Sequence, residues 1–189
     1  MILMTSGRAR RQPMDARRTE WEQRPPSAAL DDRGGQHDRY AVTLSTDGGD
    51  ADQAPLLQRA SEALLRYDIY PPNRMRRLVC SPDQRVGQDV VIVQRIFFGP
   101  VATEAAVRVV DLFGAREPDI VIGFSYVTLQ GHAERGVATF TITRGHDGHL
   151  SFNIESWSRP ASGVGKLMAP LSRLLQKRFS REALEHFRQ

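Results

Sequence analysis

Residues able to exchange protons or carry charge gather near the middle of the chain: Tyr126, His132, Glu134 and Arg135 lie within ten positions of one another. They stand in the stretch Gly123–Gly136, which alternates apolar and polar residues on both sides of a glycine-containing turn. A carboxyl group at the end of an apolar strand loses hydration, which raises its pKa and suits it to general acid catalysis. Glu134 has such a position, and the alternative is an ordinary solvated carboxylate at a strand end.

Tyr126 and His132 could complete an acid–base site with Glu134. Tyr126 shares a face with Ile122 and Phe124, and the length of the turn decides whether Glu134 lies on that face too, because strand side chains alternate. The alternative for Tyr126 is a packed core residue with a satisfied hydroxyl group. His132 lies in the turn, where it is either simply exposed or able to transfer protons near neutral pH at the mouth of a cavity.

Arg108 and Asp111 are two further candidates on an apolar strand, Thr103–Phe113. Regular alternation places Asp111 on the face of Val109 and Arg108 on the opposite face. One of the two charges therefore lies on an apolar face, where it needs a partner or a water-filled cavity. The alternative for Arg108 is a surface pair with a neighbouring acid. The predicted catalytic set is Tyr126, His132, Glu134, Arg108 and Asp111.

The elements that must position these residues are mostly strands. Val, Ile, Phe and Thr are concentrated in six segments separated by glycine and proline, and a shorter alternation precedes them at Tyr40–Leu44. The six predicted strands are Arg77–Ser81, Asp89–Phe98, Thr103–Phe113, Asp119–Leu129, Glu134–Thr143 and His149–Ser158. Short connections between them favour antiparallel neighbours.

Two helices are predicted around these strands. Leucines and alanines recur at helical spacing from Leu56 to Leu65, and Pro71-Pro72 ends that unit. A longer helix near the C-terminus has one apolar stripe, made of Leu167, Leu171, Leu174, Leu175 and Phe179. We therefore predict an α+β fold: a strongly curved antiparallel β-sheet or β-barrel enclosing a cavity, with one helix in the N-terminal half and a long C-terminal helix. The alternative is an open helix-grip, or Bet v 1-like, arrangement.

The first part of the chain differs from the rest in composition. Residues 1–38 are rich in Arg, Asp, Gln, Pro and Gly and poor in periodic apolar residues, which predicts a disordered tail. Trp21 is the residue of this tail that could dock on the body. Residues 39–189 are predicted to form a single cavity-containing domain.

Charge and composition argue against several classes of function. The net charge is +4, but basic and acidic residues alternate along the chain, so no nucleic-acid partner is predicted. No apolar run approaches the ~20 residues of a membrane span, and the single cysteine, Cys80, cannot form an internal disulfide, so we expect a cytoplasmic protein with no membrane partner. The sequence lacks zinc-type Cys/His spacing, a P-loop and a dinucleotide fingerprint, so neither a metal nor a cofactor is expected.

The stretch Gly123-Phe-Ser-Tyr-Val-Thr-Leu-Gln-Gly-His-Ala-Glu-Arg-Gly136 resembles the signature of DUF1990, also called UPF0548, a family of bacterial and plant domains. The resemblance runs from about Tyr40 to Phe187 and includes Arg108-Val109-Val110 and Ser158-Arg159-Pro160.

Two departures from the family pattern lie near the signature turn. Ala133 stands where the family usually has Pro, and Val137-Ala138 where it usually has acidic residues. Glu134 is therefore the remaining carboxylate near the turn.

Proteins of similar make-up include spiroacetal cyclases of bacterial polyketide pathways, described as β-barrels with polar residues clustered in a cavity. The resemblance implies a cofactor-independent cyclase that takes a hydrophobic polyketide and forms a spiroacetal or related cyclic ether by general acid–base catalysis. Two alternatives stay open. A non-catalytic carrier of a hydrophobic metabolite would have the cavity without a polar cluster. An interaction protein whose Arg-rich tail binds nucleic acid or a partner would have a filled core.

Overall fold

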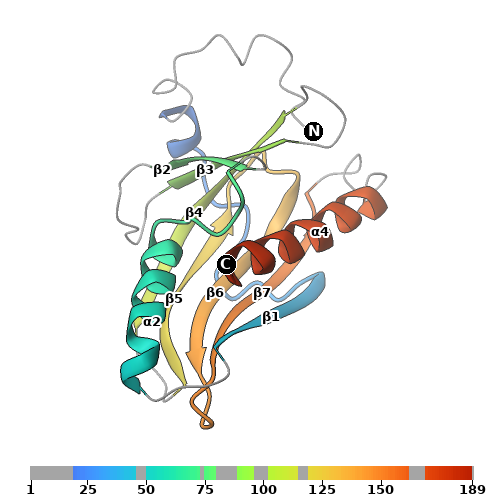
Figure 1. Ribbon diagram of the computed structural model, residues 1–189. Helices are drawn as coiled ribbons and strands as arrows, with labels where there is room; N and C mark the ends of the chain where they lie inside the picture. The colour runs from blue at the N-terminus through green and yellow to red at the C-terminus, as the bar shows by residue number, and fades with distance from the viewer. Residues whose placement is uncertain are drawn as a thin grey trace.

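The computed structural model describes residues 19–45, 50–72, 75–79, 89–95, 102–114, 119–161 and 169–188. Its seven strands form one sheet in the order β1-β7-β6-β5-β4-β3-β2, with every neighbouring pair antiparallel (Figure 1). The strands are β1 (Gln36–Ser45), β2 (Met75–Val79), β3 (Asp89–Arg95), β4 (Ala102–Gly114), β5 (Ile120–Thr128), β6 (Glu134–Arg144) and β7 (Leu150–Pro160). The helices are α2 (Asp50–Leu65) and α4 (Ala169–Arg188). Neither helix is long and apolar enough, over its described residues, to cross a membrane.

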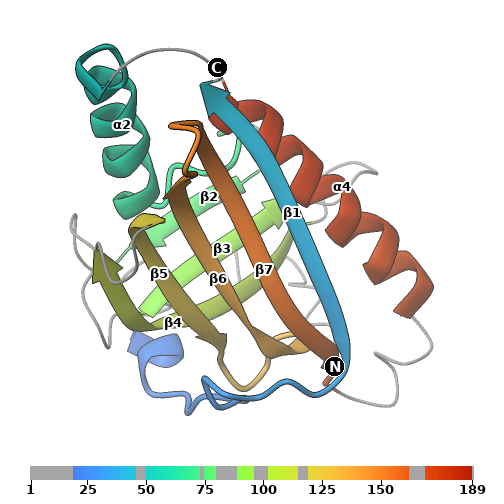
Figure 2. The same ribbon diagram turned by 90° about the horizontal axis from the view of Figure 1, so that it is seen from below.

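The predicted α+β fold is confirmed, in its open form. The expected strands are present with bounds that differ by a few residues, because apolar alternation is a local signal of a half-buried strand. β1 and β2 form opposite edges of the sheet and do not pair with each other in the described part of the chain, so the closed barrel is wrong. The sheet is curved, and α4 packs against β1 and β7 (Figure 2). A helix that covers a sheet edge is an alternative to closure, and the result is a helix-grip, or Bet v 1-like, arrangement.

Strand alternation gives the sheet two faces, and the main core lies on one of them. We call this the inner face; it carries Phe124, Phe140 and Phe152, all fully buried. The ring of Phe140 stacks at 5.0 Å from that of Phe124 and at 6.4 Å from that of Phe152. Helix α2 contributes Ala60 and Leu64 to the same core. Both helices therefore cover the inner face. We call the opposite face of the sheet the outer face.

Helix α4 meets the sheet through Phe179, a member of the predicted stripe, and through residues that follow it at the same spacing. Phe179 and Ala183 are buried, and Phe187 stacks on Phe152 with ring centroids 4.1 Å apart. Leu174 belongs to the predicted stripe, yet 65% of its surface is exposed. The buried side follows the spacing 179, 183, 187 because those residues meet the aromatic surface of the sheet. The other members of the predicted stripe lie outside the described residues, wholly for Leu167 and as side chains for Leu171 and Leu175.

Residues 19–38, part of the predicted disordered tail, are ordered. A short helical turn at residues 19–22 buries Trp21 against Ala106 and Leu129 on the outer face. β1 begins at Gln36, so the predicted boundary at residue 38 is wrong. We call residues 19–35 the N-terminal segment; it runs along one end of the sheet towards β1 (Figure 2). Its order comes from partners distant in sequence, which a composition rule cannot detect. Residues 1–18 lie outside the described residues, as do Cys80, Ser81 and residues 96–98 of the predicted strands.

Candidate functional site

Tyr126 and Glu134 lie on the inner face, on two neighbouring strands. β5 ends at Thr128 and β6 begins at Glu134, so the turn holds residues 129–133. Tyr126 pairs with Ala138, and Ala138 lies on the same face of β6 as Glu134 because the two are an even number of residues apart. The odd turn length therefore places both side chains on one face. Burial raises the pKa of the Tyr126 phenol to about 12, and the nearby negative charge of Glu134 adds to the rise.

A further inner-face group comes from the end of α2, and the sequence analysis missed it. The Asp68 N–H donates to the Ala63 carbonyl at 2.7 Å and the Tyr67 N–H to the Leu64 carbonyl at 3.0 Å, which is the Schellman pattern of a helix end. Tyr67 takes the left-handed position, with φ 57°. Glycine usually occupies this position because a Cβ is strained there. Here the turn directs a tyrosine ring into the core, where it is 2% exposed.

Three phenols meet on the inner face, and we call Tyr67, Tyr70 and Tyr126 the tyrosine cluster. The ring of Tyr67 lies 6.3 Å from each of the other two rings, measured between centroids. It also lies 5.7 Å from the ring of Phe124 and 6.2 Å from that of Phe140. Burial raises the pKa of Tyr67 and of Tyr70, and the neighbouring phenols raise both further. All three phenols are therefore neutral at pH 7 and can donate hydrogen bonds.

The hydroxyl of Tyr67 is buried and has no hydrogen-bond partner among the described residues. It lies close enough to the Tyr126 hydroxyl for each to influence the pKa of the other, yet the pair does not reach hydrogen-bond geometry. A buried hydroxyl without a partner costs about 1–3 kcal/mol. Tyr70 and Tyr126 keep part of their surface exposed, so the cluster extends from the core to the surface.

His132 lies in the turn beside Glu134 and is partly exposed. Its Nδ1 accepts the N–H of Glu134 at 3.0 Å, so the neutral ring carries its proton on Nε2. Burial lowers the pKa of His132 to about 4, although the hydrogen bond from Glu134 opposes this shift. The lowered pKa favours the neutral ring at pH 7, and proton transfer by His132 stays a prediction. Its role in this structure is to fix the start of β6.

Arg108 and Asp111 do not join the other candidates, because β4 contains a bulge. Val109 pairs with Tyr126 and Asp111 with Ser125, so Val110 is the extra residue. The bulge reverses the alternation, and both Arg108 and Asp111 lie on the outer face. The predicted opposition of the two charges and their convergence with Tyr126 are therefore wrong.

Arg108 is held by the N-terminal segment. Its guanidinium donates to the backbone carbonyls of Glu22 at 2.9 Å and Arg24 at 3.3 Å. Arg24 in turn donates to the carbonyl of Gln130 at 3.2 Å and lies over the ring of Trp21. Gly131 has φ 96°, and a Cβ at this position would collide with Arg24. The turn that carries His132 is thus clamped from the outer side.

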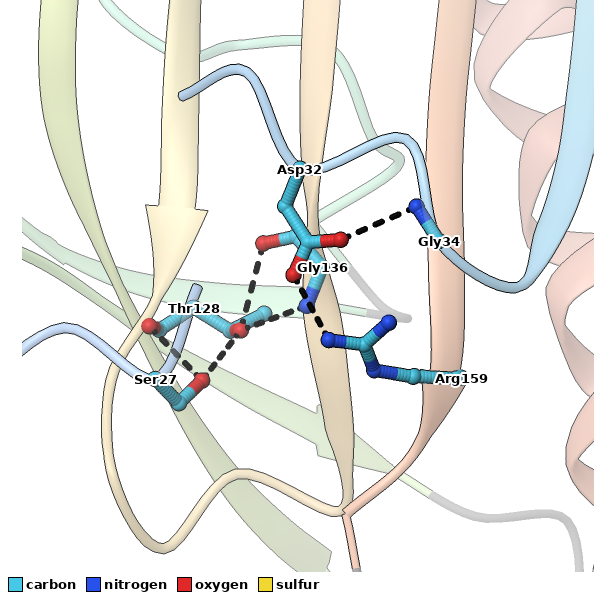
Figure 3. Close-up of polar contacts among 6 residues, drawn as sticks. All are labelled: Ser27, Asp32, Gly34, Thr128, Gly136 and Arg159. Atoms are coloured by element: carbon cyan, nitrogen blue, oxygen red, sulfur yellow. Dashed lines mark hydrogen bonds and ion pairs between the residues drawn. The ribbon is translucent and has the colours of Figure 1, made fainter. Parts of the chain in front are cut away.

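A second set of contacts joins the N-terminal segment to the strand ends (Figure 3). The Ser27 hydroxyl lies 2.9 Å from the Thr128 carbonyl and 2.6 Å from the Thr128 hydroxyl. The Thr128 hydroxyl also accepts the N–H of Gly136 at 2.9 Å. Further along, Asp32 accepts hydrogen bonds from Arg159 and from the N–H of Gly34, both at 2.9 Å. These contacts fix the ends of β5, β6 and β7 beside the tyrosine cluster.

The chemistry available at this site is that of phenols and a carboxylate. Within the described residues, no group of three His, Cys, Asp or Glu side chains is placed to hold a metal ion. Of the five predicted residues, the structure brings together Tyr126 and Glu134, with His132 next to them. It adds Tyr67 and Tyr70. The signal that could have identified Tyr67 is a large residue, where glycine is usual, between the helical pattern and Pro71-Pro72.

Solved structures share this fold at low sequence identity. A hypothetical protein from Helicobacter pylori is similar over 95% of this chain and 95% of its own, with 10% identity and a TM-score of 0.52, which shows a common fold. Protein CV1439 from Chromobacterium violaceum is 18% identical over 78% of this chain and 94% of its own, with a TM-score of 0.47. A Thalictrum flavum norcoclaurine synthase mutant, in complex with a transition-state analogue, is 12% identical over 80% and 95%, also with a TM-score of 0.47.

No curated protein matches this sequence. One protein-family model does match: the domain of unknown function DUF1990, over residues 19–186. The match begins at the helical turn of the N-terminal segment and ends in α4, so it extends the sequence resemblance upstream of Tyr40. It also contains the tyrosine cluster and the turn with His132 and Glu134. The chain therefore belongs to the DUF1990 family.

Proposed function

We propose that this protein binds a hydrophobic, oxygen-containing small molecule against the inner face and closes a ring in it by acid–base catalysis without a cofactor. The observation that carries the proposal is the tyrosine cluster beside Glu134, at the border of a buried aromatic surface. The aromatic rings supply apolar contact area, and the few polar groups among them supply orientation, as in most small-molecule sites. The cavity expected from the sequence remains a prediction.

The reaction that suits these groups is the closure of a linear dihydroxyketone of polyketide type to a spiroacetal. One substrate hydroxyl forms a C–O bond to the carbonyl carbon, its proton passes to Glu134, and a phenol gives a proton to the carbonyl oxygen. Glu134 then returns its proton to the former carbonyl oxygen, which leaves as water. The second hydroxyl forms another C–O bond to the same carbon, and its proton passes to the phenolate, so both side chains regain their starting state. No oxidant or reductant is consumed, so the atoms balance without a redox group.

The size of the expected rate enhancement follows from two effects. Holding a flexible chain in a folded conformation is worth up to about 7–11 kcal/mol in favourable cases. A positioned acid or base adds about 10²–10⁴-fold in rate. Tyr126 and Glu134 are the pair we assign to the second effect, because they share one face and each lies partly exposed.

A non-catalytic carrier of a hydrophobic metabolite is the second candidate function. The stacked rings of Phe124, Phe140 and Phe152 favour it, because such a surface binds apolar molecules without any chemistry. In that case the tyrosine hydroxyls only orient the bound molecule.

The test is the conversion of a synthetic linear dihydroxyketone to its spiroacetal, followed by NMR with the purified full-length protein. We expect acceleration by the wild type, and a loss of at least ~10²-fold in Glu134→Gln, which keeps size but cannot ionise. Glu155→Gln is the matched control, because Glu155 lies on the outer face, paired with Arg39 and His37. Equal rates in wild type and Glu134→Gln would contradict the catalytic role. Tight binding of the ketone without turnover would favour the carrier.

A further inference from the structure

Tyr67 combines two features that lower the stability of the unliganded protein. Its backbone has φ 57°, which is strained for a residue with a large side chain. Its hydroxyl is buried with no hydrogen-bond partner among the described residues. A phenylalanine at the same position would keep the ring contacts and remove the second cost. The hydroxyl is therefore the part of this residue that packing does not explain.

The surroundings of Tyr67 define the partner that its hydroxyl could accept. The ring lies against Phe124 and Phe140, so most of a molecule bound there would meet apolar surface. The charge closest to the cluster along β6 is the carboxylate of Glu134, which acts on Tyr126. An anionic group beside Tyr126 would be repelled by this carboxylate, whereas a neutral oxygen would not.

The hydroxyl is also held in advance of binding. The two hydrogen bonds at the end of α2 fix the backbone of Tyr67, and three neighbouring aromatic rings fix the side chain. A donor fixed before binding loses little conformational entropy when its acceptor arrives. Tyr70 and Tyr126 contact Tyr67 and are partly exposed, so they link the buried Tyr67 to the protein surface.

We propose that Tyr67 donates a hydrogen bond to the oxygen of a neutral, otherwise apolar ligand of the ketone, ester or ether class, and that the site selects such ligands over anions. This inference rests on the proposed binding of a hydrophobic molecule at the inner face. It adds a specificity-determining residue and the charge state of the ligand.

The test uses two fluorescent probes of similar size and the full-length protein. One is the neutral ketone propionyl-dimethylaminonaphthalene, whose emission moves to the red when its carbonyl accepts a hydrogen bond. The other is the anion anilinonaphthalene sulfonate. We expect the wild type to prefer the ketone. Tyr67→Phe should weaken ketone binding about tenfold, the loss of roughly one hydrogen bond, and shift the bound ketone's emission to the blue. Sulfonate binding should stay unchanged.

A thermal melt of the unliganded proteins supplies an independent readout. Tyr67→Phe should raise the melting temperature, because it removes a buried polar group that has no partner. Tyr40→Phe is the matched control: it removes a tyrosine hydroxyl from β1, which β7 and β6 separate from β5, and should leave both probe affinities unchanged.

The outcomes separate this inference from the proposed function. If the wild type binds the ketone and Tyr67→Phe changes neither its affinity nor its emission, this inference is wrong and the binding function stands. If the wild type binds neither probe, the binding function itself fails. A lower melting temperature in Tyr67→Phe would show that the hydroxyl already has a partner in the free protein, such as a bound water, and would also overturn the inference.

Discussion

The inner face and the N-terminal segment differ in how they treat polar groups. In the N-terminal segment, hydroxyls and charges meet partners from distant parts of the chain: Ser27 meets Thr128, and Asp32 meets Arg159 (Figure 3). On the inner face, the hydroxyl of Tyr67 is buried without a partner among the described residues. The polar groups of the N-terminal segment hold strand ends together, whereas the Tyr67 hydroxyl makes no such contact within the described residues.

The difference indicates that the two faces of the sheet have different roles. Satisfied polar networks make a structure rigid, whereas a buried polar group without a partner is costly and calls for an explanation. The N-terminal segment clamps the turn that leads into β6, and Glu134 is the first residue of that strand. We infer that the segment supports the site from the outer side, while ligand contact belongs to the inner face.

The largest expected effect concerns the packing of the N-terminal segment on the outer face. Trp21→Ala should lower the free energy of unfolding by about 3–5 kcal/mol, because Trp21 is 3% exposed and its loss leaves a hole against Ala106 and Leu129. Urea denaturation measures the change. Leu174→Ala is the control, since 65% of Leu174 is exposed, and it should be close to neutral. A negligible effect of Trp21→Ala would mean that the N-terminal segment is dispensable, and would contradict its supporting role.

The next effect concerns the inner face at alkaline pH. The folded-state pKa of Tyr126 is raised from 10.0 to about 12, so the folded protein prefers the neutral phenol. This contribution to stability is fully present below pH 10 and is lost as the pH rises through 12. It amounts to about 1–3 kcal/mol, at 1.36 kcal/mol per pKa unit. The free energy of unfolding, measured by denaturation at a series of pH values from 9 upwards, should therefore decrease less steeply with pH in Tyr126→Phe. Identical slopes in the two proteins would show that Tyr126 is not shifted.

The smallest effect tests whether the two regions are independent. Ser27→Ala removes the hydroxyl that meets both the carbonyl and the hydroxyl of Thr128, and should cost about 1 kcal/mol of stability. Ketone-probe binding at the inner face should not change, because Thr128 keeps its hydrogen bond with Gly136. A change in probe affinity at unchanged stability would show that the N-terminal segment and the inner-face site are coupled, rather than independent.

Local patterns were sufficient for the strands, but they left open whether Tyr126 and Glu134 share a face. Alternation of apolar residues marks β4 to β7, and the odd turn between β5 and β6 places Tyr126 and Glu134 on one face. The same alternation failed at Arg108 and Asp111, because a bulge at Val110 inserts a residue and reverses the faces beyond it. A bulge is set by the pairing of two strands, which the pattern of one strand does not contain.

The sequence by itself determined the α+β class, the family and the antiparallel direction of neighbouring strands, because periodicity and turn residues act over short distances. Only the tertiary structure decided that the sheet stays open, that Trp21 is buried, and that Phe187 rather than Leu174 meets the sheet. It also decided the place of Tyr67, a residue at a helix end that joins the tyrosine cluster when α2 packs on β5 and β6. These features depend on contacts between residues far apart in the chain, and burial energy there outweighs local preference.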